Sequence, residues 1–169
     1  LFRSGARPGD ALILGKPLGV GVYSAALKKD RLDADGYRQM IANTTQLNTP
    51  GRRLAAMNDV HALTDVTGFG LLGHLNEICL GSQLRATLNG KAIPLLPGVE
   101  TLVGEGFVTG ASERNWAGYG KHVQLNGVGD TMKALLTDPQ TSGGLLVACA
   151  PGAVPEVLKT FADEGFERA

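Results

Sequence analysis

The sequence has few cysteines, few aromatic residues, no excess of either charge and no long apolar run. Its two cysteines, Cys79 and Cys149, stand apart among apolar residues and form no C-x-x-C pair, which indicates reduced, buried thiols and a cytoplasmic location. Sixteen basic residues balance sixteen acidic ones, and this argues against a nucleic-acid partner, which usually needs a basic surface. No apolar run approaches the roughly 18 residues of a membrane span, so we expect no membrane partner.

Glycine, in contrast, is abundant. The chain has 24 glycines among 169 residues, about twice the average share of roughly 7%. There is no Gly-X-Y repeat, and an apolar content of 43% is enough for a core, so collagen-like and disordered classes are excluded. Because the chain starts at Leu1 rather than Met, we expect a fragment or a processed product.

Apolar periodicity predicts short strands that alternate with amphipathic helices. We expect strands at 10–15, 61–66, 84–88 and 145–150, and helices at 20–27, 33–47, 50–57, 71–80, 97–105, 132–136 and 154–161. Residues 107–126 are rich in glycine, serine and asparagine, and we expect a long surface loop there. The alternation favours a mixed sheet, with helices covering mainly one of its faces.

The segment 63–74 (LTDVTGFGLLGH) has the clearest chemical pattern. Asp65 ends a predicted strand, and Thr67, Gly68 and Gly70 lead into a helix. Free N–H groups at a helix start attract phosphate oxygens, and Mg²⁺ is usually held by one or two carboxylates together with substrate phosphates. The segment therefore fits a corner that binds Mg²⁺ and phosphate. Taken alone, it fits an ordinary turn between strand and helix better, with Thr67 as the N-cap, because such turns need these residues anyway.

A second glycine-containing segment is the loop 138–144 (DPQTSGG). Thr141, Ser142 and Gly143 offer hydroxyls and flexible backbone amides before a strand, a composition that suits an anion-binding nest. No base lies nearby in the sequence to activate Ser142, which argues against a hydrolase nucleophile. A plain polar loop between helix and strand has the same composition.

The third glycine cluster lies between Gly15 and Gly21. It lacks the Gly-Lys-Ser/Thr end of a Walker A loop, and Ser24 replaces the third glycine of a dinucleotide-binding fingerprint. Lys16 remains a candidate to contact a phosphate as a point charge. The three histidines share no zinc-binding spacing, so we expect structural or solvent-exposed roles for them.

The three segments 10–19, 63–74 and 138–145 occur in an order and at a spacing that resemble the C-terminal domain of selenophosphate synthetases (selenide, water dikinases). These enzymes belong to the superfamily of aminoimidazole ribonucleotide synthetase. The resemblance covers essentially the whole chain. It implies an α+β fold, a mixed β-sheet flanked by helices. It also implies that residues 1–169 are the single C-terminal domain of a two-domain enzyme whose N-terminal, ATP-binding catalytic domain is absent.

The family converts ATP, selenide and water into selenophosphate, AMP and phosphate, with Mg²⁺ as cofactor. The resemblance makes Asp65 a metal ligand, has Thr67, Gly68 and Gly70 shape the adjoining turn, and lets the loop Thr141, Ser142 and Gly143 line the same cleft. The family's catalytic residues lie in its N-terminal domain, and full-length members are homodimers. We therefore expect this chain alone to be inactive.

Two alternatives stay open. The chain resembles, more distantly, other members of the superfamily, such as a purine-pathway synthetase or a hydrogenase-maturation protein. A non-catalytic binding module that has kept this fold is the other alternative, and Asp65 argues only mildly against it.

Overall fold

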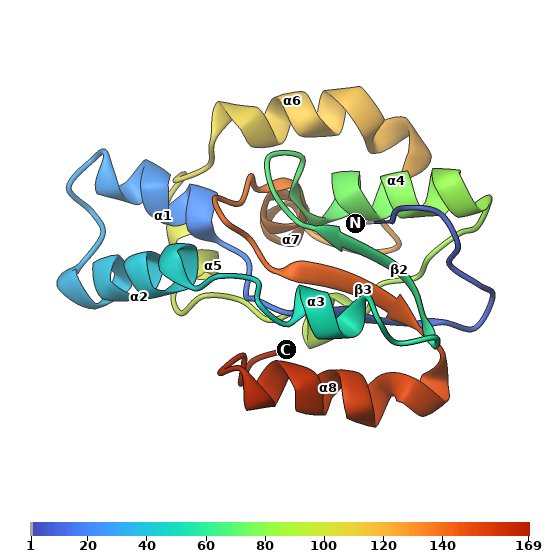
Figure 1. Ribbon diagram of the computed structural model, residues 1–169. Helices are drawn as coiled ribbons and strands as arrows, with labels where there is room; N and C mark the ends of the chain where they lie inside the picture. Colours follow the sequence, from blue (N-terminus) through green and yellow to red (C-terminus); the bar gives the residue numbers. More distant parts are fainter. Residues whose placement is uncertain (1) are drawn as a thin grey trace.

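The computed structural model describes residues 2–169, with a small β-sheet at the centre (Figure 1). The three strands are, in spatial order, β1 (Ala11–Leu14), β3 (Leu145–Cys149) and β2 (Val60–Asp65). β3 runs antiparallel to both neighbours, so that Leu14 lies opposite Leu146 and Asp65 lies opposite Leu145. Consequently β1 and β2 both end beside the start of β3, at one edge of the sheet.

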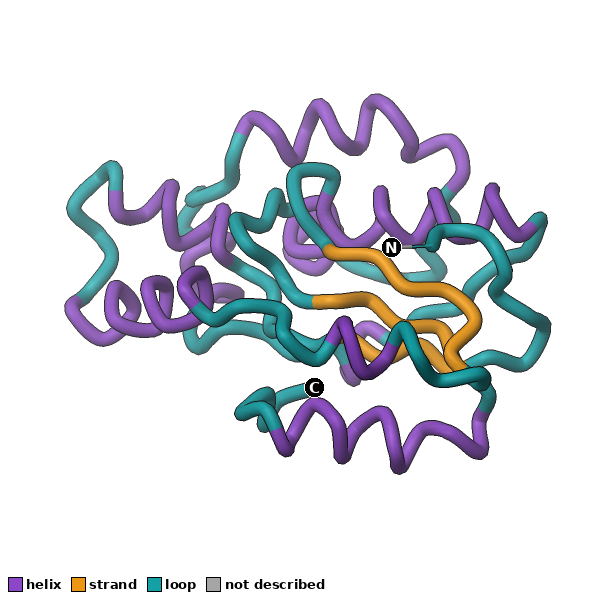
Figure 2. The backbone as a smooth tube through the Cα atoms, in the orientation of Figure 1, coloured by secondary structure: helices purple, strands orange, loops and turns teal. Residues whose placement is uncertain are grey.

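Eight α-helices surround the strands in the described part of the chain (Figure 2). They are α1 (Val20–Leu27), α2 (Ala34–Thr45), α3 (Gly51–Leu54), α4 (Gly70–Ser82), α5 (Val99–Gly104), α6 (Gly110–Tyr119), α7 (Asp130–Thr137) and α8 (Val154–Asp163). Short 3₁₀ turns at Gly90–Ala92, Gly120–His122 and Pro151–Ala153 join some of them. The α+β class that the sequence predicts is confirmed, and seven of these helices overlap predicted ones. No helix in residues 2–169 has the length and apolarity to cross a membrane.

Helices cover both faces of the sheet. On one face α3 and α8 pack against Ile13, Leu63 and Val147, with Phe161 of α8 fully buried. On the other face α4 and α7 pack against alternate residues of the same strands, including Leu14 and Leu146 (Figure 1). The prediction that helices cover mainly one face is therefore wrong. It is wrong because the central strand β3 is apolar at every position and so has two faces to bury.

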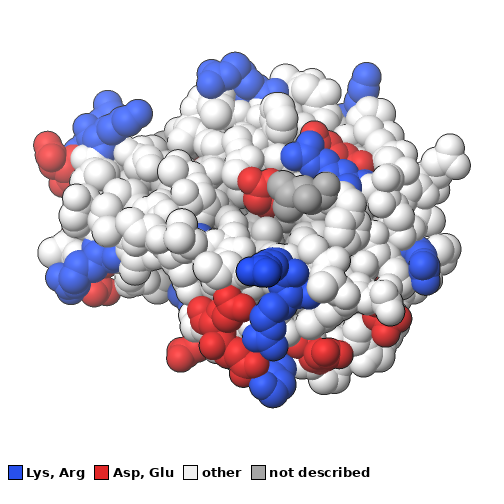
Figure 3. Space-filling view, viewed as in Figure 1, with Lys and Arg blue, Asp and Glu red and all other residues white. Residues whose placement is uncertain are grey.

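A third apolar cluster lies beyond the edge where β1 and β2 end. It joins α1, α2, α5 and α7 around the buried Tyr23 and Leu135. At the bottom of the view in Figure 3, charges of both signs gather over α3 and α8. There Arg53 pairs with Asp163 at 3.6 Å and Glu164 at 3.9 Å, so this charged area has no single sign.

The strand expected at 84–88 does not form, and the three strands of the sheet pair antiparallel rather than in a mixed sheet. Of the expected buried face of this strand, Leu84 and Leu88 are half-buried but Ala86 is exposed, and the segment does not pair with β1. The Asn89 side chain accepts a hydrogen bond from the Lys91 N–H at 3.1 Å and starts a 3₁₀ turn. Only beyond this turn does a single parallel bridge form, between Leu95 and Leu18.

Residues 107–126 are not a long loop, because α6 occupies their centre. The Thr109 side chain caps the start of this helix by accepting a hydrogen bond from the Ser112 N–H at 3.3 Å. Trp116 and Tyr119 then pack against the cluster beneath α4 and α7. The glycine content hid this helix, whereas Thr109 with Glu113 in the first turn was a usable signal for its start.

Candidate functional site

The three glycine-containing segments meet at the edge of the sheet where β1 and β2 end. The Val66 N–H donates to the Gly144 carbonyl at 2.9 Å, and the Gly15 N–H donates to the Leu145 carbonyl at 2.8 Å. The Gln140 N–H donates to the carbonyl of Thr67 at 3.0 Å. Residues more than 120 positions apart in the chain thus share one small region, because both outer strands end against the start of β3.

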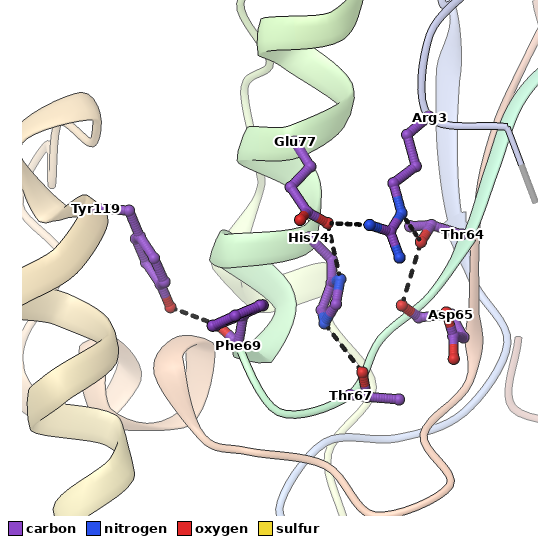
Figure 4. Close-up of polar contacts among 8 residues, drawn as sticks. All are labelled: Arg3, Thr64, Asp65, Thr67, Phe69, His74, Glu77 and Tyr119. Carbon is purple, nitrogen blue, oxygen red and sulfur yellow. Dashed lines mark hydrogen bonds and ion pairs between the residues drawn. The ribbon is translucent and has the colours of Figure 1, made fainter.

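Asp65 is the last residue of β2 and is half-buried (Figure 4). Its carbonyl accepts a hydrogen bond from the Thr64 hydroxyl at 3.4 Å. Its carboxylate has no hydrogen-bond or ion-pair partner among residues 2–169. Within the same residues, no three His, Cys, Asp or Glu side chains come together as a metal site. This chain therefore offers one unpartnered carboxylate here and no complete set of metal ligands.

The turn that follows Asp65 carries two glycines with different roles. Gly70 has a φ of +68°, and a Cβ there would lie 2.7 Å from the backbone of Thr137, so only glycine fits. Gly68 is exposed, and a Cβ there would meet nothing within 4 Å. Helix α4 begins after Phe69 without a side-chain cap. Thr67 is therefore not the N-cap. Its carbonyl accepts from the Gly70 N–H at 3.1 Å, and no side chain among residues 2–169 caps the start of α4.

The Thr67 hydroxyl instead contacts a histidine. His74, on the first turns of α4 and only 3% exposed, places Nε2 3.2 Å from Thr67 Oγ1 (Figure 4). Its Nδ1 lies 3.2 Å from Glu77 Oε2, which also pairs with Arg3 at 3.2 Å. Arg3 Nε donates to Thr64 Oγ1 at 3.1 Å, which joins the network to the strand that carries Asp65.

Helix α6 holds the same turn from the other side. The Asn115 side-chain amide donates to the carbonyls of Gly68 at 2.9 Å and Thr137 at 3.0 Å. The Tyr119 hydroxyl donates to the carbonyl of Phe69 at 2.6 Å, and burial raises the pKa of this phenol to about 12. Sequence reasoning missed Asn115 and Tyr119 as turn-holding residues, because it placed them in a loop.

The loop 138–144 contributes two side chains that bind the start of α1. Asp138 Oδ2 accepts hydrogen bonds from the N–H groups of Gly21 at 2.9 Å and Val22 at 3.4 Å. Gln140 Oε1 accepts from those of Gly19 and Val20, each at 3.3 Å. All four free N–H groups of this helix start are therefore occupied. Asp138 is fully buried, and this burial raises the pKa of its carboxyl to about 7.

Lys16 does not face a ligand cleft in this structure. It is 1% exposed, and its ammonium donates to the carbonyls of Asn43, Gln46 and Ser142 at 2.9, 2.7 and 2.6 Å. Burial lowers the pKa of this amine. The three donors are used within the chain, so none is left for a phosphate. Sequence reasoning did not foresee this, because the three acceptors are backbone atoms of two distant segments.

The rest of the loop divides into exposed and packed residues. Thr141 and Ser142 are exposed, and Ser142 has a φ of +48°. Gly143 is buried, and a side chain there would collide with the carbonyl of Val66. Gly143 is thus explained by close backbone packing, whereas the two hydroxyls are accessible from outside.

The other residues singled out in the sequence lie elsewhere. His61 Nδ1 lies 2.8 Å from the Asp10 carboxylate, away from the turn, and His122 is exposed. Cys149 is buried in the core and Cys79 is partly buried, both as free thiols. Burial raises the pKa of each thiol.

The chain matches the family described as AIR synthase related protein, C-terminal domain, over residues 7–169. It is 67% identical to a selenide, water dikinase of Burkholderia pseudomallei (strain K96243) over 97% of this chain and 47% of that protein. It is 60% identical to one of Pseudomonas straminea over 97% of this chain and 46% of that protein. The chain therefore spans about half the length of these curated relatives.

Two solved structures share the fold at lower identity. Thiamine-monophosphate kinase from Stenotrophomonas maltophilia K279a superposes with a TM-score of 0.64 and 21% identity, covering 96% of this chain and 46% of that one. Hydrogenase maturation protein HypE in complex with ATP gives a TM-score of 0.61 and 20% identity, covering 95% of this chain and 40% of that one. With the family match over residues 7–169, these findings show that the chain belongs to the AIR synthase related family and corresponds to its C-terminal domain.

Proposed function

We propose that this chain is the C-terminal domain of a selenide, water dikinase. The observation that carries the proposal is the 67% identity to the Burkholderia pseudomallei relative of that name, over 97% of this chain. The full-length enzyme would convert ATP, selenide and water into selenophosphate, AMP and phosphate. Other superfamily members are a weaker alternative, since the kinase and HypE neighbours are only 20–21% identical and share the fold alone.

The turn after β2 would be the part of this chain that faces the phosphates of ATP. Asp65 would be a ligand of Mg²⁺, because its carboxylate is half-buried, has no partner in the described residues, and stands beside an uncapped helix start. When bound, Mg²⁺ would neutralise charge on the phosphate oxygens. One carboxylate does not complete such a site, so the other ligands would come from outside this chain.

The other candidate site residues would have different roles, which follow from the contacts that each makes. Thr67, Gly68 and Gly70 would shape the turn, with Gly68 leaving room for a ligand next to the backbone. The exposed hydroxyls of Thr141 and Ser142 would donate to phosphate oxygens. Gly143 and Lys16 would support the loop from inside.

The other half of the enzyme would supply the catalytic residues. Since this chain spans 47% of the first relative, we propose an N-terminal, ATP-binding domain that precedes it in the full-length protein. We also propose that the full-length protein is a homodimer, largely through that domain, and that it acts in the cytoplasm. We propose no membrane partner and no nucleic-acid partner for it.

Activity of the full-length protein and of its Asp65→Asn variant tests the function and the metal assignment separately. AMP release from ATP and selenide is followed by chromatography, and selenophosphate by ³¹P NMR. We expect Asp65→Asn to lower the rate at least about 100-fold, because a charged metal ligand becomes a neutral amide. The exposed Asp59, at the other end of β2, supplies a matched control, Asp59→Asn, which should retain the rate.

Two results would contradict the proposal. Full-length protein that makes no selenophosphate would refute the function, and full activity in Asp65→Asn would refute only the metal role. The isolated chain should release no AMP and bind ATP with Mg²⁺ too weakly for calorimetry. Micromolar affinity would show that this half holds the nucleotide by itself.

A further inference from the structure

His74 lies at the centre of a chain of polar contacts beneath the proposed phosphate-facing turn. The chain runs from Arg3 to Glu77, to His74 and to Thr67, with 3.2 Å at each of the three contacts (Figure 4). His74 is 3% exposed, and the Phe69 ring lies over it with 5.7 Å between ring centres. Water therefore has little access to the imidazole. The hydrogen bonds to Glu77 and Thr67 determine which ring nitrogen carries hydrogen.

The direction of these hydrogen bonds follows from the chemistry of the partners. The guanidinium of Arg3 pairs with the Glu77 carboxylate, and an ionised carboxylate can only accept hydrogen bonds. His74 must then donate from Nδ1. A neutral imidazole that carries hydrogen on Nδ1 has a bare Nε2, which can only accept. In this neutral form the donor to Nε2 is the hydroxyl of Thr67, whereas an imidazolium would donate from Nε2 to the Thr67 oxygen.

A threonine hydroxyl has one hydrogen and two lone pairs. Because the hydrogen of Thr67 is committed to His74, its oxygen can only accept from anything else that approaches. Such an oxygen suits a hard cation or the water that a cation carries, and it cannot donate to a phosphate oxygen. Thr67 follows Asp65 by two positions, so the turn presents a carboxylate and a hydroxyl oxygen that both act as acceptors.

We propose that His74 is a positioning residue that, held by Glu77, fixes the Thr67 hydroxyl as an acceptor directed at the Mg²⁺ of the dikinase. This inference rests on the proposed function. It assigns a role to Thr67, expected as a turn residue, to His74, expected to be structural or solvent-exposed, and to Glu77, which the sequence did not single out. It separates Thr67 from Thr141 and Ser142, whose hydroxyls have no hydrogen-bond partner within residues 2–169 and stay free to donate.

The first test measures the histidine directly and needs no activity. A long-range ¹H–¹⁵N correlation spectrum of the protein distinguishes the two neutral tautomers of an imidazole. We expect the Nδ1–H form for His74, and a slowly exchanging Thr67 hydroxyl proton bound to Nε2. The Glu77→Gln variant should disturb this tautomer. An Nε2–H or doubly protonated His74 in the unaltered protein would overturn the proposal.

The second test measures the Mg²⁺ concentration that gives half-maximal activity of the full-length enzyme. Thr67→Val removes the oxygen, and His74→Leu removes its anchor. We expect each to raise this concentration about 10–100-fold, as is usual for outer partners of metal sites. Thr67→Ser should retain it, and His74→Gln should restore part of the loss because its amide oxygen can accept.

A purely structural histidine would behave differently. His74→Leu would then lower the melting temperature while Thr67→Val left the Mg²⁺ requirement unchanged, and this pair of results would refute the proposal. The exposed His122 supplies a matched control, His122→Gln, which should change neither. Inactive unaltered enzyme would instead refute the proposed function, so the two failures are distinguishable.

Discussion

Two helix starts at the same edge of the sheet look alike in sequence and differ in structure. Both α1 and α4 follow a strand and a glycine-rich turn. The start of α1 is closed, since Asp138 and Gln140 occupy its four free N–H groups. The start of α4 has no side-chain cap, and Gly68 and Phe69 before it are exposed. A glycine-rich helix start is thus available to an anion only where no buried side chain of the same protein has taken its N–H groups.

Lys16, in the turn before α1, also has all its donors occupied by the chain itself. Replacing it should lower the free energy of unfolding more than the other changes considered below. Lys16→Met keeps the apolar stem but leaves the carbonyls of Asn43, Gln46 and Ser142 without their donor. We expect a loss of about 3–4 kcal/mol in the free energy of unfolding, because unpaired buried carbonyls are costly. Urea titration measures it, with Lys28→Met, at an exposed lysine, as the control. A stable variant with weakened phosphate binding would instead support the original phosphate-contact prediction.

A pair of alanine substitutions compares the two turns directly. At Gly21, in the closed start, a side chain would collide with the Asp138 carboxylate and lie 2.8 Å from the Pro139 carbonyl. We expect Gly21→Ala to cost about 2–3 kcal/mol despite the better helix propensity of alanine. Gly68→Ala, in the open turn, should change stability by less than about 0.5 kcal/mol. Equal losses in thermal unfolding would show that the two starts are packed alike.

How far the sequence predicted this region depends on the range of the contacts involved. The strand pattern predicted that Asp65 would end a strand, and the family resemblance implied that the loop 138–144 lies beside it; in the structure they do lie together. The roles of Lys16 and Gln140 were not predictable, because each bonds backbone atoms more than 25 positions away. The contact of Thr67 with His74 was easier to predict, because the two residues are only seven positions apart and the histidine on α4 faces back to the turn.

Helix α6 was missed for a different reason. Its glycines and polar residues have the composition of a loop, and the stabilising contacts come from packing of Trp116 and Tyr119 rather than from propensity. Local composition therefore predicted which backbone segments are special here. It did not predict which side chains close one helix start and leave the other open.

The closed start should also respond to pH, through Asp138. Burial raises the pKa of this carboxyl to about 7, above its value in the unfolded chain. Between roughly pH 4 and pH 7 the carboxyl is therefore protonated in the folded protein and ionised in the unfolded chain. Stability from this group therefore rises as pH falls through that range and is lost as pH rises through 7, by at most about 1.4 kcal/mol per unit. Asp138→Asn removes the titration but keeps an acceptor for the Gly21 N–H.

The informative quantity is the difference in unfolding free energy between Asp138→Asn and the unaltered protein. We expect it to shift in favour of the variant by up to about 2 kcal/mol between pH 5 and pH 7, measured by urea titration at each pH. The exposed Asp130, as Asp130→Asn, should show no such shift. A flat difference would mean that Asp138 stays charged in the fold. The closed start of α1 would then hold a full carboxylate, and the contrast with α4 would be electrostatic as well as steric.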